Sequence, residues 1–379
     1  MKKNILYILG IALLFHLLIS CKDSNSDNNP SGPDEENPSQ WLTETISISA
    51  KSPVVALDNN NNPHISFLDA GYVKYASRNS GNWDIETVGK VSNAGGTYAN
   101  GGISALAVDA FDRPHISYYD YGNICFQYAV KNEGGWNITP VALPNDPKMS
   151  YDSPFIPWAE SSIIIDKNSG MVHIAFQMLG GLSGYVMGYW NSTMMTALIA
   201  DGDGTNIGYQ NSIALDNNGW PAISYEDRGN NILKYAQWNG AGFDVQNISA
   251  MPNVYWREHL TSLDIDNDNN AHIAFYGHGG YKYAVQNNNT WLIDMIPFDS
   301  GYPALSLSLD NTDCPQIAFV SLDTGSSYRL KYSCLDNSDW LYNNVEDGVN
   351  HCSVTTGSDG KIALVYETND NILKYTYNK

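Results

Sequence analysis

Three histidines cannot be explained by any repeat in this chain, and imidazole is the side chain best suited to proton transfer near neutral pH. They are His259, His278 and His351. The other histidines include four that recur at one place in a repeated phrase and are interpreted as structural: His64, His115, His173 and His272. The three unexplained histidines are therefore the first candidates for chemistry.

The stretch NVYWREH, which ends at His259, adds a phenol and a guanidinium to the imidazole. Elimination beside a uronate carboxylate needs a base, an acid and a group that neutralises the carboxylate. His259, His278, Tyr255 and Arg257 together could supply all three roles. They form the candidate catalytic set for a polysaccharide lyase.

Aromatic side chains gather in similar irregular segments, and aromatic faces beside polar groups suit the apolar faces and hydroxyls of sugar rings. The candidate ligand-binding residues are Tyr98, Trp158, Tyr209, Trp256, Arg257, His259, His278, Tyr302 and His351. The alternative is that these side chains only pack neighbouring structural units together.

A sevenfold repeat must position these residues. Six copies align on an Asp that closes a short apolar run, at Asp58, Asp109, Asp166, Asp216, Asp266 and Asp310, and a degenerate seventh copy runs from Cys352 to Glu367. The spacing of about 44 to 57 residues is typical of blades or solenoid turns. The runs are rich in Val, Ile, Tyr and Phe and are separated by Asn, Gly, Asp and Pro, which favours strands and turns.

Each copy reads as four strands: the run before the Asp, a PHISY-like run, an LKYA-like run, and a run that usually opens with an aromatic residue. Seven units of four strands predict an all-β fold, a seven-bladed β-propeller. The globular part begins with WLTETISI, which looks like a fourth strand, and ends with LKYTYNK, which looks like a third strand. The N-terminal strand should therefore complete the last blade and close the ring.

The PHISYYD and LKYA phrases resemble those of bacterial, Bacteroidetes-type, seven-bladed propeller lipoproteins with sialidase-like or BNR-like repeats. The resemblance covers residues 41–379 and implies a fold, not an activity. Sialidase activity is not expected, because five scattered arginines do not readily supply the three-arginine clamp of that family.

Strand order in a propeller places the candidates on one face. The loops between second and third strands and the connections between blades emerge on the same side. His278 lies in the first kind of loop, and His259 and His351 end the second kind. All three should therefore project on one face, where ligands of propellers usually sit.

The chain before the propeller divides into two segments. Residues 1–21 begin with two lysines, continue with an apolar stretch and end in LISC, which resembles a lipobox with Cys21 as the lipidated residue. Residues 22–40 are Asp, Asn, Ser, Pro and Glu with almost nothing apolar, as in a disordered tether. We expect a lipoprotein anchored to the outer membrane, and the Lys-Asp pair after the cysteine favours display at the surface.

The formal net charge is −20, with 40 acidic and 20 basic residues. Phosphate binding needs a basic face, so a nucleic-acid partner is not expected. A glycan or a protein remains as the ligand of a monomeric propeller, and a polysaccharide lyase is the enzymatic alternative; the charge disfavours a strongly anionic polysaccharide unless a local basic patch or a cation intervenes. No cofactor is expected, apart from a weak calcium candidate at Asp264, Asp266 and Asp268.

The cysteines after Cys21 could form one disulfide in an exported protein. Cys314 precedes a second strand and Cys334 ends the third strand of the same blade, which would bring them opposite one another. A Cys314–Cys334 bridge is therefore the expected pairing. Cys125 and Cys352 fall in different blades and are expected to be buried thiols.

Overall fold

The computed structural model describes residues 41–79, 81–91, 104–123, 125–141, 160–179, 184–195, 197–202, 206–252, 261–288, 290–297, 304–322, 328–336 and 339–378. Within these ranges the chain forms 28 strands, and no helix there is long and apolar enough to cross a membrane. The predicted leader and tether, with Cys21, lie outside the described residues.

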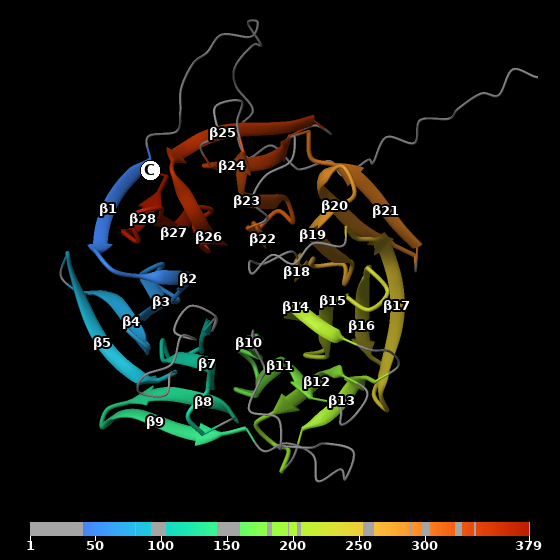
Figure 1. Cartoon of the computed structure of the whole chain (residues 1–379), viewed down its shortest axis with the longest axis horizontal. Coiled ribbons are helices and arrows are strands. Elements are labelled where there is room, and N and C mark those ends of the chain that lie inside the picture. The colour runs from blue at the N-terminus through green and yellow to red at the C-terminus, as the bar shows by residue number, and fades with distance from the viewer. Residues whose placement is uncertain are drawn as a thin grey trace, which may run out of the picture.

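The strands form seven four-stranded sheets arranged around a central channel, which confirms the predicted β-propeller (Figure 1). Blade 1 holds β2 (Lys51–Leu57), β3 (Pro63–Asp69), β4 (Tyr72–Asn79) and β5 (Asn82–Lys90). Blade 2 holds β6 (Ala105–Val108), β7 (Pro114–Asp120), β8 (Cys125–Asn132) and β9 (Gly135–Pro140). Blade 3 holds β10 (Ser161–Ile165), β11 (Val172–Leu179), β12 (Tyr185–Asn191) and β13 (Leu198–Asp201).

Blade 4 holds β14 (Ile207–Leu215), β15 (Pro221–Asp227), β16 (Ile232–Trp238) and β17 (Phe243–Ala250). Blade 5 holds β18 (Thr261–Ile265), β19 (Ala271–Gly277), β20 (Gly280–Asn287) and β21 (Thr290–Met295). Blade 6 holds β22 (Leu305–Leu309), β23 (Pro315–Leu322), β24 (Tyr328–Asp336) and β25 (Asp339–Asp347). Blade 7 holds β26 (Val349–Thr356), β27 (Ile362–Thr368), β28 (Leu373–Tyr377) and the N-terminal strand β1 (Leu42–Ser47).

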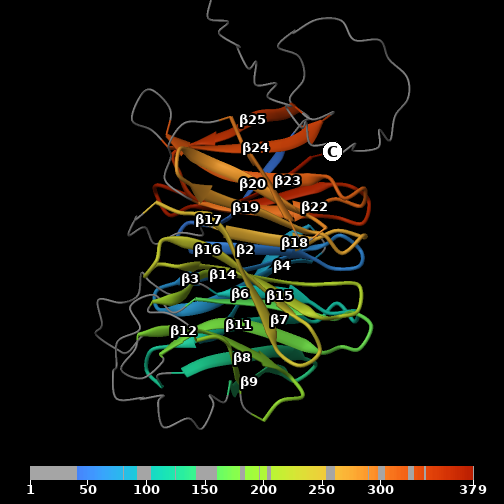
Figure 2. The same ribbon diagram turned by 90° about the vertical axis from the view of Figure 1, so that its right-hand side faces the viewer.

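The innermost strands β2, β6, β10, β14, β18, β22 and β26 line the channel. Every blade is antiparallel, so its turns fall alternately on the two ends of the disc (Figure 2). We call the end with the blade-to-blade connections and the second turn of each blade the upper face. The lower face carries the turn that begins at the repeated Asp.

The repeated Asp builds the lower turn by accepting backbone hydrogen bonds. Oδ1 of Asp58 accepts from the N–H groups of Asn60 and Asn62, at 2.8 and 2.7 Å. The turn also contains Asn61 in the left-handed region, at φ 60°, which an Asn tolerates better than most residues. The Asn-rich sequence between the first two strands is therefore turn chemistry.

The repeated histidine joins this turn to the third strand, as the structural interpretation expects. Nδ1 of His115 lies 2.7 Å from the Tyr128 hydroxyl, and its Nε2 lies 3.2 Å from Oδ2 of Asp109. In blade 6, Gln316 takes the histidine's place and contacts both Asp310 and Tyr332. The contact can therefore be made by glutamine as well as by an imidazole, and blades 4 and 7 do without it, with Ala222 and Ala363 at this position.

We expect His115→Gln to lower the free energy of unfolding by less than about 1 kcal/mol, because glutamine makes the same pair of contacts in blade 6. His115→Leu should cost about 1–3 kcal/mol, since the partly buried Tyr128 hydroxyl and one Asp109 contact lose their partner. Denaturant unfolding of both variants measures the difference. Equal losses would mean that the imidazole has a role beyond this contact.

Adjacent blades are joined by aromatic pairs in which the Tyr of an LKYA-like strand meets the aromatic residue of the next outermost strand. The edge-on pairs are Tyr75–Trp136, Tyr189–Phe243, Tyr235–Trp291, Tyr283–Trp340, Tyr332–Trp41 and Tyr375–Trp83. Such a pair contributes about 0.5–1.5 kcal/mol beyond its buried area. Trp41 thus makes the contact of an outermost strand for blade 7.

The ring closes as the sequence predicts, with β1 antiparallel to β28 and Leu42 opposite Tyr377. Glu44 on β1 accepts a hydrogen bond from the Trp83 indole of blade 1 at 3.0 Å. Glu86 on β5 accepts the same kind of bond from Trp136 at 3.1 Å. Strand β1 therefore takes the role that an outermost strand has elsewhere in the ring.

Candidate functional site

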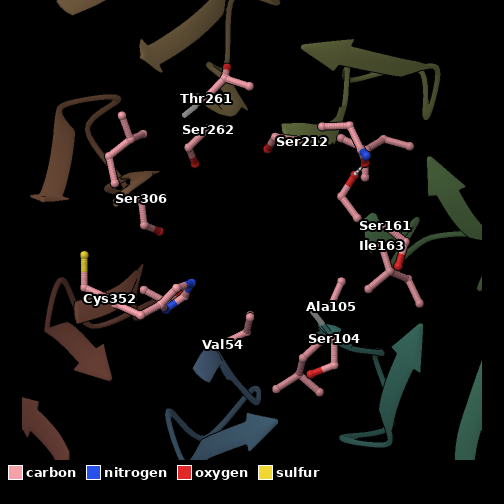
Figure 3. Close-up of a pocket in the computed structure, with 17 residues that line it drawn as sticks. Val54, Ser104, Ala105, Ser161, Ile163, Ser212, Thr261, Ser262, Ser306 and Cys352 are labelled. Carbon is pink, nitrogen blue, oxygen red and sulfur yellow. Dashed lines mark hydrogen bonds between the residues drawn. The ribbon is translucent and has the colours of Figure 1, made fainter. Parts of the chain in front are cut away.

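A polar cavity of about 150 Å³ opens at the upper mouth of the channel, where the seven innermost strands begin (Figure 3). We call this cavity the upper mouth. Its hydroxyl-bearing lining residues are Ser104, Ser161, Ser162, Ser212, Thr261, Ser262, Ser306 and Ser353. Asn211, His351 and Cys352 also line it, and no described lining residue is Asp, Glu, Lys or Arg.

Part of this hydroxyl ring holds neighbouring blades together. Oγ of Ser212 accepts a hydrogen bond from the N–H of Leu263 at 3.0 Å, and Oγ of Ser306 accepts from Val354 at 3.1 Å. Ser262 and Ser353 make the equivalent contact, and that of Ser353 joins blade 7 to blade 1. Ser262 also donates to the Leu307 carbonyl at 3.5 Å, whereas Ser212, Ser306 and Ser353 only accept at this contact, so their own hydrogens can be directed to a ligand or water in the channel.

The ring is uneven, because the position of these serines is Val54 in blade 1 and Ala105 in blade 2. Blades 3 to 7 therefore present hydroxyls, while blades 1 and 2 present apolar groups (Figure 3). A cavity with a polar arc and an apolar arc suits a small molecule whose own surface is divided in the same way.

The structure describes two of the three unexplained histidines. His278 is exposed in the turn between β19 and β20, and His351 is buried in β26, where it lines the upper mouth opposite Glu367 in the strand register. His259, with Tyr255, Trp256 and Arg257, lies outside the described residues. The fifth-blade lyase hypothesis therefore stays a prediction.

Of the predicted aromatic platforms, only Tyr209 is described, because Tyr98, Trp158 and Tyr302 lie outside the described residues. Tyr209 is 7% exposed and sits beneath the Arg228 guanidinium, whose carbon is 3.8 Å from the ring centroid. Its ring face is therefore covered by a cation and is not an open platform for a sugar.

Arg228 also reaches a buried carboxylate. Its Nε and Nη2 donate to Oε2 of Glu226 at 3.2 and 3.0 Å. Glu226 has no exposed surface, and its other oxygen, Oε1, has no hydrogen-bond partner. A buried ion pair with a spare acceptor is costly to maintain, which makes this junction between blades 3 and 4 unusual.

A second buried carboxyl lies in the same junction. Oε2 of Glu160 accepts from the backbone N–H of Gln210 at 2.6 Å, and Oε1 accepts from the Gln210 side chain at 2.9 Å. Burial raises the pKa of Glu160 to about 8, with the Arg228 charge opposing the rise and the Glu226 charge adding to it. At neutral pH Glu160 is therefore mostly a neutral acid.

Burial likewise raises the pKa of Glu226, and the nearby Arg228 charge opposes that rise. Burial also raises the pKa of Tyr209 to about 12. We call Glu160, Tyr209, Gln210, Glu226 and Arg228 the blade 3/4 cluster. Perturbed carboxyls in one place are a feature of functional sites as well as of structural ion pairs.

Sequence reasoning identified only Tyr209 from this cluster. A usable signal was present, because Glu226 is the sixth residue of its second strand, where blades 1 and 2 have the apolar or aromatic Leu68 and Tyr119. The only other carboxylate at that position is Glu367, whereas Asp227 is the seventh residue of its strand. Alignment by strand register, not by acidic character, separates the two positions.

In blade 4, the carboxylate that ends the second strand pairs with a lysine of the third strand. Lys234 lies 3.2 Å from Asp227 and 2.9 Å from Asp201. This pairing is absent from blade 1, where Lys74 donates to Thr87 and Asp69 accepts from Ser49. The recurring carboxylates therefore have different local roles.

The expected Cys314–Cys334 disulfide is not formed, since Cys334 is a thiol. The residue opposite Cys334 is Gln316, two positions beyond Cys314. Diagonal neighbours in a sheet are about 7–8 Å apart, beyond the reach of a disulfide. Cys352 is a buried thiol, as expected, whereas Cys125 is a thiol that is only partly buried.

The carboxylates predicted as weak calcium ligands make separate hydrogen bonds instead. Asp264 accepts from the N–H groups of Ile265 and Leu309, both at 2.9 Å, and Asp266 accepts from Asn270 and lies beside His272. Among the described residues, no group of three or more His, Cys, Asp or Glu side chains is arranged to hold a metal ion. These carboxylates support the lower turn and the next blade.

No family model matches the sequence, and no curated protein matches it. Solved structures are similar in fold. A variant of the Aleuria aurantia lectin, in complex with Fucα1-6GlcNAc, has 12% identity and a TM-score of 0.52 over 81% of this chain and 97% of that one. The polysaccharide lyase Uly1 has 10% identity and a TM-score of 0.50 over 86% of this chain and 88% of that one. One binds and one cleaves, so the shared fold does not decide the activity.

Proposed function

We propose that this chain is a lipid-anchored cell-envelope propeller that binds a glycan at the upper mouth. The lipobox-like end of the leader and the polar tether support anchoring through Cys21 to the outer membrane. The observation that supports glycan binding is the lining of the upper mouth, which is rich in hydroxyls and carries no described charged side chain, in a protein of net charge −20.

An uncharged polyhydroxyl ligand fits that lining better than other classes do. Polyanions would approach against the net charge of the protein, whereas sugar hydroxyls can exchange hydrogen bonds with serine hydroxyls and with the Asn211 amide. The apolar arc at Val54 and Ala105 suits the apolar face of a sugar ring. The cavity is smaller than the 300–1,000 Å³ of a typical ligand pocket, so it suits one terminal residue of a glycan.

The test is a screen of the full-length chain against a glycan array and soluble polysaccharides. Ala105→Leu fills the apolar side of the upper mouth and is expected to weaken binding at least tenfold. Ala107→Leu is the matched control: it lies two residues along β6 and lines the lower part of the channel, so it should leave affinity within about threefold. Absence of glycan binding, or equal effects of both variants, would overturn the proposal.

A further inference from the structure

The upper end of β14 departs from the regular strand. Its pairing with β15 shifts register between Tyr209 and Ser212, so Gln210 and Asn211 bulge out of the ladder. Gln210 has a φ of 53°, a left-handed conformation that is uncommon for a non-glycine residue, and it is 1% exposed. A buried, strained bulge persists only where its surroundings hold it in place.

The bulge changes what blade 4 presents to the upper mouth. Asn211 lines the cavity with an amide, where blades 2, 3 and 5 present Ser104, Ser161 and Thr261 at the equivalent position. Its Oδ1 accepts a hydrogen bond from Ser162 at 2.8 Å, and its Nδ2 donates to the carbonyls of Glu160 and Gly208, both at 3.3 Å. Both N–H groups are therefore engaged, and the second lone pair of Oδ1 is what Asn211 can offer to a ligand hydroxyl.

Glu160 supports the bulge from the neighbouring blade. Its carboxyl accepts both the backbone and the side-chain N–H of Gln210, and its carbonyl accepts from Asn211. Both bulged residues therefore depend on one residue of blade 3. A fourth bond, from the Gln177 N–H to the Glu160 carbonyl at 3.2 Å, fixes Glu160 to its own blade.

We propose that Glu160 is the positioning residue of the upper mouth: its carboxyl and its carbonyl hold the β14 bulge that places the Asn211 amide in the cavity. The assignment rests on the proposed glycan binding at that mouth. Glu160 acts through Gln210 and Asn211 and does not itself line the cavity.

The charged groups around Glu160 determine how pH affects this support. Arg228 and Glu226 act on it from blade 4, and Tyr209, itself next to Tyr185, is the titratable group on β14. A proton lost from Glu160 leaves a second buried carboxylate near Glu226, with one guanidinium between them. In the folded protein the buried Glu160 keeps its proton over a pH range in which a hydrated glutamate releases it. Local opening that exposes Glu160 to water therefore becomes more favourable as pH rises through this range.

The first test compares Glu160→Ala with Glu160→Gln in the full-length chain, using the glycan found in the screen. The alanine variant should weaken binding at least tenfold, because the bulge loses its acceptor. The glutamine variant, whose amide oxygen can still accept from Gln210, should bind within about threefold of the original. Equal affinity of the original and the alanine variant would overturn the proposal.

The second test needs no ligand and uses amide hydrogen exchange at Gln210 and Asn211. The opening constant, corrected for the intrinsic exchange rate, should rise up to about tenfold per pH unit between pH 5 and 8 in the original chain. It should stay flat in Glu160→Gln, while Glu133→Gln, at an exposed carboxylate, should follow the original. A flat profile in the original would overturn the proposal. If no glycan binds but this profile appears, the proposed ligand is wrong and the role of Glu160 in supporting the bulge stands.

Discussion

Replacing Arg228 by methionine is expected to lower the free energy of unfolding by about 3–5 kcal/mol. The substitution leaves Glu226 buried without its counter-charge, and removing one partner of a buried ion pair has a cost of this size. It also uncovers the Tyr209 ring, which lies against the guanidinium. Urea unfolding followed by tryptophan fluorescence measures the loss.

Two further variants isolate the cause. Arg329→Met breaks an ion pair with Asp347, whose side chain is 64% exposed, and should cost less than about 1 kcal/mol. Adding Glu226→Gln to Arg228→Met removes the stranded charge and should restore at least half of the lost stability. If the double variant is no more stable than Arg228→Met alone, packing of the guanidinium, and not its charge, explains the effect.

Glu160→Gln is expected to change how the global stability depends on pH. The pKa of Glu160 is about 8 in the folded chain and near 4.5 in the unfolded chain, so the folded state retains a proton that the unfolded state releases. The stabilisation from this proton is fully present below about pH 4.5 and is lost as pH rises to about 8. Glutamine does not titrate and keeps its contribution at every pH.

The stability of Glu160→Gln minus that of the original chain should therefore increase by about 3–5 kcal/mol between pH 4.5 and 8.5, and then level off. Groups with lowered pKa values, such as Asp109 and Asp266, make both proteins less stable in acid by the same amount, so their contribution cancels in the difference. Chemical denaturation at a series of pH values gives the curve. A difference that is constant with pH would show that Glu160 is ionised in the folded protein.

The architecture could be predicted because its determinants are local and repeated. The Asp before each lower turn, the histidine that contacts it and the LKYA-like tyrosine recur in register, so each blade supports the interpretation of the others. Trp41 could be assigned to an outermost strand because it opens WLTETISI as the aromatic residues open the other fourth strands. The structure confirms the closed ring.

For the candidate site, the sequence predicted a face of the propeller but not the contacts that the side chains make there. Counting strands gave Tyr209 a place in a connection, but it could not show that Arg228 covers its ring. Glu160 and Gln210 are distant in sequence and meet only because β14 bulges, and a bulge has no sequence periodicity. The Cys314–Cys334 prediction failed for a related reason, since two positions of register decide whether cysteines meet.

The closure of the ring has a consequence for how the protein reaches its native state. Thr43 hydrogen-bonds to Thr376, 333 positions along the chain, so the first strand has no partner until the last has been made. Contacts of such long sequence separation form late and slowly. Until the last strand has been made, β1 is therefore an unpaired edge that can join another chain. The step most vulnerable to aggregation should be ring closure, and substitutions in β1 should reduce the yield of folded protein more than they reduce its final stability.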